Sequence, residues 1–284
     1  MIVEVWGDIE MRGIDTSKVC EKAEIINAYF FNTIKVLRGR GKNKLVRESV
    51  NKGTAHVVMN GPSLEESKGL IKDIGGAVMM VNSAYKTLLF KELSPDYLCF
   101  ADPYFLLEDS QYHKELTDYL LSSGYRGTLI LPETAYECFG DLACPKLYIS
   151  NFVTNSGYDN RIKRLLVKNM ISPNYVNVSI LALYAAIQMG YTTIYLHGMD
   201  FSYIKDCSVD HNNNISGSIC HYWEKIPSNF NSLHGDFNMK DHIESYYYVI
   251  RTLYLIEKYA LDTGVKIYNM SPNSFLDMFV KYKL

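Results

Sequence analysis

The chain has 284 residues, of which 29 are Lys or Arg and 31 are Asp or Glu, and 48% of the residues are apolar. This length allows one large domain or two small ones around a sizeable core, and the composition excludes disordered, collagen-like and coiled-coil proteins. The formal net charge of −2 argues against a surface that tracks nucleic acid, because such domains are strongly basic. We therefore expect no nucleic-acid partner, and any basic partner surface must be local.

Apolar runs and cysteines predict the compartment. No run of about 18 apolar residues is present, so we expect no membrane-spanning helix. The acidic start, MIVEVWGDIE, differs from the basic end and apolar stretch of a secretory signal. The six cysteines are scattered, without the Cys-x-x-Cys pairs of a zinc site. We expect free thiols in a cytoplasmic protein.

Residues 1–53 predict a helical and basic N-terminal extension. Apolar residues recur at steps of three or four from Val19 to Leu37, which is the helical period. Six Lys or Arg and no acid follow within residues 35–47, and two glycines in that run argue against a continuous helix. The basic run is either a solvated linker, which is the simpler interpretation, or a peripheral contact with anionic lipid head groups or an anionic substrate.

From residue 54 onward, short β-rich apolar runs alternate with helical patterns. The runs cover residues 56–60, 77–82, 96–102, 128–133, 146–150, 193–200 and 266–271. Continuous apolar runs indicate strands that are covered on both faces, and therefore parallel strands with helical crossovers. Helical patterns cover residues 64–74, 178–189 and 241–262. The sequence predicts an α/β fold with a Rossmann-like, mostly parallel, doubly wound sheet over residues 54–284.

Residues 202–241 form a long stretch with weak periodicity. The stretch is rich in Asn, Ser and Gly and carries three of the seven histidines. A loop of this length in a compact domain is usually a functional lid or a disordered segment. Its aromatic residues, among them Tyr203 and Tyr222, favour a lid that folds over a ligand.

The residues that follow the strands predict the site, because ligands of open parallel sheets bind outside the carboxyl ends of the strands. The first strand leads into Asn60-Gly61-Pro62-Ser63, in which Gly61 permits close backbone approach and Ser63 has the capping-box spacing to Glu66. A helix start of this kind suits a nucleotide phosphate. Other strands end at Asn82, Asp102 and Asp200. Each of these could cap its own turn, but their convergence on one edge favours a ligand site. Residues 271–274, after the last strand, fit the rim or a plain helix cap equally.

Three blocks of the sequence resemble a known family in order and spacing. They are Asn60-Gly61-Pro62-Ser63-Leu64, residues 182–202 and residues 267–276. They resemble the bacterial sialyltransferases of glycosyltransferase family 42 and the related domain-of-unknown-function-115 group, which includes motility accessory factors and hydroxymethylpterin diphosphokinases. The resemblance covers about residues 55–280 and implies a GT-A-like variant of the Rossmann-like fold. It also implies an inverting, metal-independent transferase that needs no cofactor and moves a nonulosonic acid from a CMP-activated donor to a cell-surface glycan, as in lipopolysaccharide or capsule biosynthesis.

The resemblance also implies roles for individual residues. Nucleotide-binding roles fall on Asn60, Gly61, Pro62, Ser63, Asn82, Asn177, Val178, Ser179, Gly198, Met199, Asp200, Phe201 and Tyr222. Catalytic roles fall on Tyr203, which would hold the donor phosphate, and on Asp102, which stands where the sialyltransferases carry Asn. The sequence departs from the family in having Tyr175 or a neighbour in place of an Arg, and no second tyrosine after Tyr203 until Tyr222.

The resemblance places the catalytic base in a histidine just before the penultimate helix. His242 and His234 both fit, with His221 behind them. Asp241 and Glu244 have the spacing of a capping box, which would put His242 in the first turn of the helix, where the helix dipole disfavours imidazolium.

Two other functions remain open. A diphosphokinase of the hydroxymethylpterin type would need ATP and Mg²⁺, which Asp102 and Asp200 could bind. A non-catalytic nucleotide-binding module would leave the histidines incidental. In the transferase interpretation the partners are the CMP-sugar and the glycan, the location is the cytoplasm or the inner face of the membrane, and the chain could form a homo-oligomer.

Overall fold

The computed structural model describes residues 45, 51–136, 138–139, 142–150, 153–154, 157–229 and 238–283. The predicted helix from Val19 to Leu37, the basic run apart from Leu45, and His234 lie outside these residues. The lipid contact of residues 35–47 and the domain division at residue 53 therefore stay predictions. Among the described residues, no helix is both long and apolar enough to cross a membrane.

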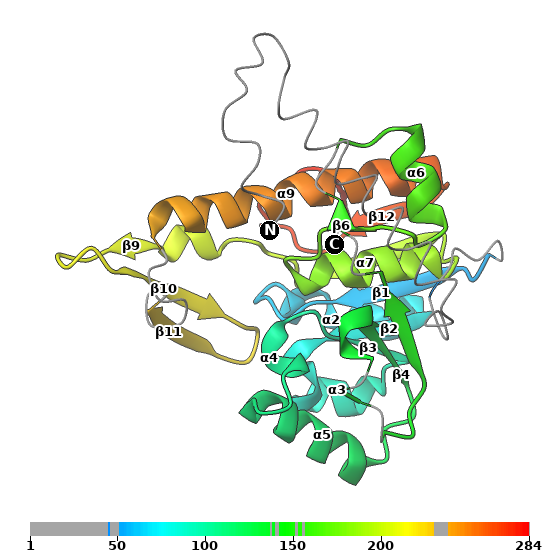
Figure 1. Cartoon of the computed structure of the whole chain (residues 1–284), viewed down its shortest axis with the longest axis horizontal. Helices are drawn as coiled ribbons and strands as arrows, with labels where there is room; N and C mark the ends of the chain where they lie inside the picture. The colour runs from blue at the N-terminus through cyan, green and yellow to red at the C-terminus, as the bar shows by residue number, and fades with distance from the viewer. Residues whose placement is uncertain are drawn as a thin grey trace, which may run out of the picture.

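The centre of the fold is a parallel sheet of eight strands (Figure 1). The strands lie in the order β13-β12-β8-β1-β2-β3-β4-β5. Their bounds are β1 Thr54–Val58, β2 Ala77–Val81, β3 Tyr97–Cys99, β4 Thr128–Pro132, β5 Lys146–Ile149, β8 Thr193–His197, β12 Lys266–Asn269 and β13 Val280–Lys281. All seven predicted strands are present, and β13 is an additional edge strand. The strand order changes direction between β1 and β8, which makes this the switch point of the sheet.

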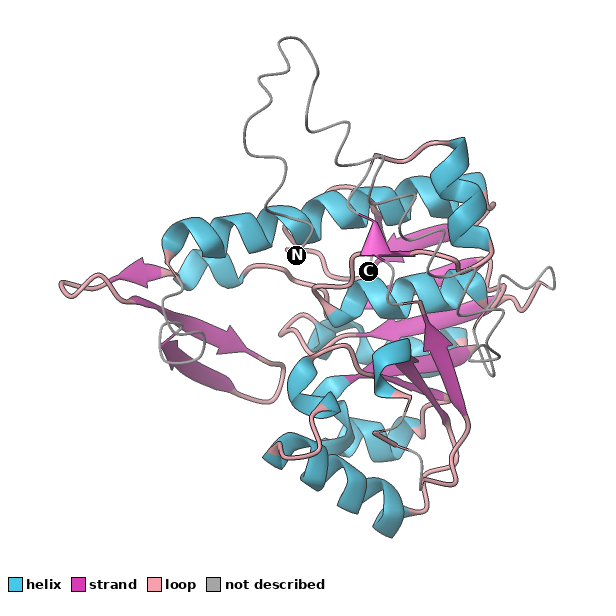
Figure 2. Ribbon diagram, viewed as in Figure 1, coloured by secondary structure: helices cyan, strands magenta, loops and turns pink. Residues whose placement is uncertain are grey.

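Helices cover both faces of the sheet, which confirms the doubly wound prediction (Figures 1 and 2). The helices are α2 Leu64–Ile74, α3 Leu88–Leu93, α4 Pro103–Leu106, α5 Gln111–Ser123, α6 Asn160–Val167, α7 Val178–Gln188 and α9 Met239–Asp262. Ala55 and Val57 of β1 pack into one core with α6, α7 and α9, whereas Val58 packs into a second core with α2, α3 and α5. Successive residues of a strand point to opposite faces, so the apolar run of β1 serves both cores.

The described part of the expected lid, residues 202–229 and 238–241, contains regular elements. It contains the 3₁₀ helix η3 Tyr203–Asp206 and a three-stranded antiparallel sheet of β9 Ser208–Val209, β10 Ile215–Cys220 and β11 Lys225–Asn229. Its strands contain Ser, Gly, Asn and Pro, which are poor or neutral strand formers, so periodicity did not predict them. Figure 1 shows this sheet beside the N-terminal end of α9 and away from the central sheet.

Smaller elements connect these layers. They are the 3₁₀ helices η1 Asn82–Lys86 and η2 Glu133–Ala135 and the parallel pair β6 Val153–Thr154 and β7 Ser172–Pro173. Cys99, Cys144 and Cys207 are free thiols, as predicted.

Both predicted capping boxes are wrong. The side chain of Ser63 caps nothing at the start of α2; its hydroxyl donates instead to Oγ of Ser271 at 2.7 Å. At α9 the capping box is formed by Asn238 and Asp241, because the helix begins two residues before the predicted start. His242 still lies in the first turn of α9.

Candidate functional site

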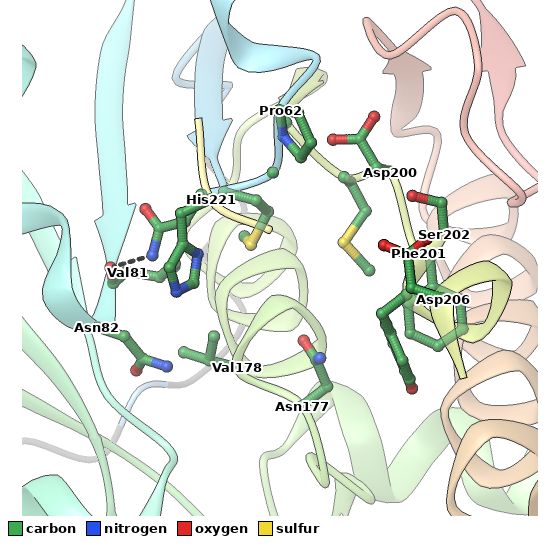
Figure 3. Close-up of a pocket in the computed structure, with 16 residues that line it drawn as sticks. Pro62, Val81, Asn82, Asn177, Val178, Asp200, Phe201, Ser202, Asp206 and His221 are labelled. Carbon is green, nitrogen blue, oxygen red and sulfur yellow. Dashed lines mark hydrogen bonds between the residues drawn. The ribbon is translucent and has the colours of Figure 1, made fainter. Parts of the chain in front are cut away.

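A cavity of about 270 Å³ lies at the carboxyl ends of β1, β2 and β8, beside the switch point (Figure 3). Ten of the predicted nucleotide-binding residues line it: Asn60, Gly61, Pro62, Asn82, Asn177, Val178, Gly198, Met199, Asp200 and Phe201. Tyr203 and His221 also line it, together with Met59, Val81, Ser202 and Asp206, to which the sequence analysis gave no role. A pocket at this place is typical of open α/β sheets.

The loop after β1 interlocks with the loop after β8. The backbone N–H of Gly61 donates to the carbonyl of Gly198 at 2.9 Å, and the N–H of Ser63 donates to Oδ2 of Asp200 at 3.1 Å. A Cβ atom on Gly61 would overlap both the Asp200 carboxylate and the Gly198 carbonyl. Gly198 itself has a positive φ of 62°, which favours glycine. The two glycines therefore allow the loops to touch along their backbones.

Residues 271–274 brace this pair of loops from behind. Oγ of the fully buried Ser271 accepts from the Ser63 hydroxyl at 2.7 Å and from the Met199 N–H at 3.0 Å. The Ser274 hydroxyl donates to the Met199 carbonyl at 2.7 Å. Of the two roles left open for this segment, bracing the rim is therefore the one it has, and no helix follows it.

Two amide side chains present unpartnered acceptors at the cavity. Nδ2 of Asn60 donates to the Val81 carbonyl at 3.4 Å, and this bond is drawn in Figure 3. Oδ1 of Asn60 and Oδ1 of Asn82 are buried and have no hydrogen-bond partner among the described residues. A buried acceptor without a donor costs about 1–3 kcal/mol. Because neither oxygen is exposed, a hydroxyl or amino group of a ligand could donate to it only after the side chain turns toward the cavity.

Tyr203 separates His242 from the cavity. Its ring packs edge-on against His242, with ring centroids 5.8 Å apart. Burial raises the pKa of Tyr203, so its hydroxyl stays protonated and remains a donor. His242 is buried, its Nε2 lies 3.1 Å from Sγ of Cys207, and burial lowers its pKa. The structure thus places His242 behind the cavity wall.

His221 is the histidine that the structure brings to the cavity among the described residues. It lies in the turn between β10 and β11, and its ring stacks on Trp223 with centroids 4.6 Å apart. Burial lowers the pKa of His221, against smaller opposing effects of Glu224 and the Asn60 backbone. The neighbouring Tyr222 ties this turn to the loop after β1, because its N–H donates to the Asn60 carbonyl at 2.9 Å.

Several predicted residues lie outside the cavity. Ser63 and Ser179 are buried, and the ring of Tyr222 packs against the core beneath α2 and α3. Asp102 is the N-cap of α4, where its Oδ1 accepts from the Tyr104 N–H at 3.0 Å. The structure therefore does not bring Asp102 and Asp200 together at the cavity.

The carboxylates that do line the cavity are Asp200 and Asp206. Mg²⁺ in nucleotide sites is commonly held by one or two carboxylates together with phosphate oxygens. Asp200 and Asp206 fit that pattern in part, since Oδ2 of Asp200 already accepts from Ser63. Within the described part of the chain, no group of three or more His, Cys, Asp or Glu residues could hold a metal by itself.

Comparison with protein-family models gives a match over residues 27–206, to the model described as MptE-like, 6-hydroxymethylpterin diphosphokinase MptE-like. The match covers more than half of the chain. The chain belongs to the MptE-like family. No curated protein matches it.

The family match confirms one part of the resemblance seen in the sequence, the part that concerns the hydroxymethylpterin diphosphokinase group. It begins at residue 27, inside the predicted N-terminal extension, and ends at Asp206. It therefore includes the cavity residues of this MptE-like chain except His221. The likeness to sialyltransferases stays a prediction.

Proposed function

We propose that this MptE-like chain is a nucleotide-dependent transferase whose donor is a CMP-activated nonulosonic sugar and whose acceptor is a hydroxyl of a cell-surface glycan. One observation carries the proposal: the cavity at the switch point offers the amides of Asn60, Asn82 and Asn177 and the protonated Tyr203, its charged lining residues are Asp200 and Asp206, and no Lys or Arg is among the described residues that line it. Without a cation, such a lining disfavours a triphosphate more strongly than it disfavours a CMP-sugar, which carries fewer negative charges and leaves as a nucleoside monophosphate.

The acceptors of Asn60 and Asn82 support a nucleoside at one end of the cavity. Ribose hydroxyls and a base amino group are donors, and they would satisfy the buried oxygens of these two side chains. The volume of about 270 Å³ is near the lower end of the roughly 300–1,000 Å³ common for small-molecule sites. The size favours one nucleotide over a dinucleotide.

The N-terminus of α7 and Tyr203 support a phosphate at the other end. Asn177 and Val178, at the start of α7, line the cavity, and helix N-termini favour anions. The Tyr203 hydroxyl can donate to the phosphate oxygen on which charge develops as the donor bond breaks. The acceptor hydroxyl attacks the anomeric carbon, the bond from that carbon to the phosphate oxygen breaks, and the proton of the hydroxyl passes to a neutral base. His221 can take this role from the cavity wall, while His242 would act only after the Tyr203 side chain moves.

A second function is favoured by the family match and by two carboxylates at the cavity. Members of a diphosphokinase group transfer diphosphate from ATP, and Asp200 and Asp206 would hold Mg²⁺ together with phosphate oxygens. Bound Mg²⁺ would neutralise charge on the transferred phosphates. Without a cation, the two carboxylates would repel a triphosphate.

Calorimetry with CMP, CDP and ATP, each in Mg²⁺ and in EDTA, separates the two functions. We expect CMP to bind equally well in both buffers. Binding of ATP that strictly requires Mg²⁺, with no binding of CMP, would refute the CMP-sugar proposal and favour the diphosphokinase.

The base is identified by substituting the histidines one at a time and measuring CMP release from a CMP-sugar. We expect His221→Ala to retain CMP binding and lose turnover. His234→Ala and His242→Ala test the two positions predicted from the sequence. His211→Ala is the matched control, because His211 lies in the same insertion, is exposed and does not line the cavity. Full turnover in all three test variants would exclude these three histidines as the base.

A further inference from the structure

The outward face of α9 carries a seam of apolar side chains that the described elements leave exposed. Ile243, Tyr247, Tyr254 and Leu261 are 47%, 55%, 39% and 66% exposed. Together with the half-buried Ile250, they occupy five of the six positions that alternating steps of four and three residues define for a coiled-coil seam, and the half-buried Glu257 occupies the sixth. At 1.5 Å per residue the seam is about 27 Å long.

The opposite face of α9 is already used by the core. Tyr246, Val249, Leu253 and Ile256 are buried there against the sheet and α7. Figures 1 and 2 show α9 along the outer edge of the molecule, with α6 beside its C-terminal end. Single exposed apolar residues are ordinary, but a contiguous row of them marks an interaction surface.

We propose that α9 pairs with α9 of a second copy of this chain, antiparallel, about a two-fold axis level with Thr252. In that arrangement Ile243 faces Leu261 of the second copy, and Ile250 faces its Tyr254. The Tyr247 hydroxyl faces the Glu257 carboxylate of the second copy, to which it can donate. The seam is thus complementary to itself, as a two-fold interface requires.

A hollow lies beside the seam. It has a volume of about 330 Å³ and is lined by Tyr158, Tyr247, Ile250, Arg251 and Tyr254, among others. In the antiparallel arrangement the hollow lies opposite Tyr254 of the second copy, whose hydroxyl donates to Oδ1 of Asp277 in its own chain at 2.9 Å.

The charges beside the seam favour the antiparallel direction. Glu244 and Lys258 are exposed, and neither forms an ion pair within the described part of the chain. Antiparallel pairing puts Glu244 of each helix beside Lys258 of the other, whereas parallel pairing puts the Glu244 and Lys258 residues of the two copies on opposite sides of the seam. Charges beside the seam set partner and direction in helix pairs.

Sedimentation velocity of the full chain, from about 1 to about 100 µM, tests the pairing, since an interface of this size should bind in the micromolar range. We expect a concentration-dependent dimer that the double variant Ile243→Glu, Leu261→Glu converts to a monomer. Leu121→Glu is the control, because Leu121 is 63% exposed on α5, away from the seam, and it should leave the dimer unchanged. Far-UV circular dichroism checks that each variant is folded.

A charge exchange then tests the direction. Glu244→Lys and Lys258→Glu should each weaken the dimer about threefold to tenfold, and the double exchange should restore it, since each variant alone opposes like charges twice. A chain that stays monomeric at all concentrations, including one whose own residues 1–44 cover the seam, would overturn the proposal. So would a dimer that is indifferent to the seam variants, or one that the double exchange fails to restore.

Discussion

The interlocked loops predict that a single methyl group at Gly61 disturbs the whole site. A Cβ atom there overlaps the Asp200 carboxylate and the Gly198 carbonyl, so one of the loops must shift by about 1 Å to restore van der Waals distances. The hydrogen bond from the Ser63 N–H to Asp200, now 3.1 Å, would stretch to about 4 Å and be lost.

The loss of this hydrogen bond determines how much Gly61→Ala lowers the free energy of unfolding. A hydrogen bond to a charged acceptor is worth about 1.5–3 kcal/mol, and Asp200 is only 9% exposed, so water replaces the lost donor poorly. We expect Gly61→Ala to lower the free energy of unfolding by about 2–3 kcal/mol in urea titrations, and to weaken CMP binding by about tenfold or more.

Gly69→Ala is the matched control. Gly69 lies inside α2, and nothing stands within 4 Å of the position of its Cβ atom. Alanine is a better helix former than glycine by about 1 kcal/mol, so this variant should be more stable than the parent and bind CMP equally well. If Gly61→Ala matched Gly69→Ala in both measurements, the steric account of the loops would be refuted.

Three further predictions follow from buried polar groups. Burial, with the charge of His56 as a second cause, lowers the pKa of His197 to about 3. Below about pH 6.5 the unfolded chain therefore binds a proton at this histidine, whereas the folded chain does not. The free energy of unfolding falls as the pH falls, by about 2 kcal/mol at pH 5. His197→Gln should reduce the difference in unfolding free energy between pH 7 and pH 5 by that amount, and an unchanged difference would contradict the assignment. Tyr203→Phe should keep the fold and the CMP affinity but slow CMP release from a CMP-sugar by about 100-fold, since one donor to the leaving group is lost. Normal turnover in this variant would show that Tyr203 takes no part in the reaction. Ser271→Ala should lower the free energy of unfolding, measured in urea, by about 2–3 kcal/mol, because the Met199 N–H and the Ser63 hydroxyl lose their shared acceptor. A loss below about 0.5 kcal/mol would show that water replaces this acceptor.

The sequence predicted the sheet well because its strands are nearly continuous apolar runs, and such runs serve two cores at once. Positions after strands, a consequence of parallel topology, also predicted the cavity residues of the loops after β1, β2 and β8. The resemblance added Asn177, Val178 and Phe201. It did not predict β9–β11, whose Ser, Gly and Asn residues carry no strand period, and it therefore placed His221 behind other candidates. Asp102 shows the opposite error, since a residue after a strand can cap the next helix instead of facing a ligand.

The tyrosines show a similar limit. Composition alone does not explain why the chain has 23 tyrosines. Residue type does not show which of them pack in the core and which take part in chemistry. Tyr184 and Tyr259 are fully buried and hydrogen-bonded within the core, Tyr247 and Tyr254 lie on the seam of α9, and Tyr203 faces the cavity. Only the tertiary positions of the side chains distinguish these roles.

The geometry also explains why the three sequence blocks resemble enzymes with different chemistries. Gly61, Gly198 and Ser271, one from each block, hold the loops against one another through backbone contacts and buried hydroxyls. This bracing specifies the shape of the cavity and leaves its substrate open. Much of the chemistry of the cavity is set by side chains outside the three blocks, such as Asn82, Asn177, Tyr203, Asp206 and His221. The motifs therefore predict the position of the cavity, which is the nucleotide site of the proposed function. The choice between a sugar donor and a triphosphate depends on the other positions, whose residue types can change without disturbing the loops.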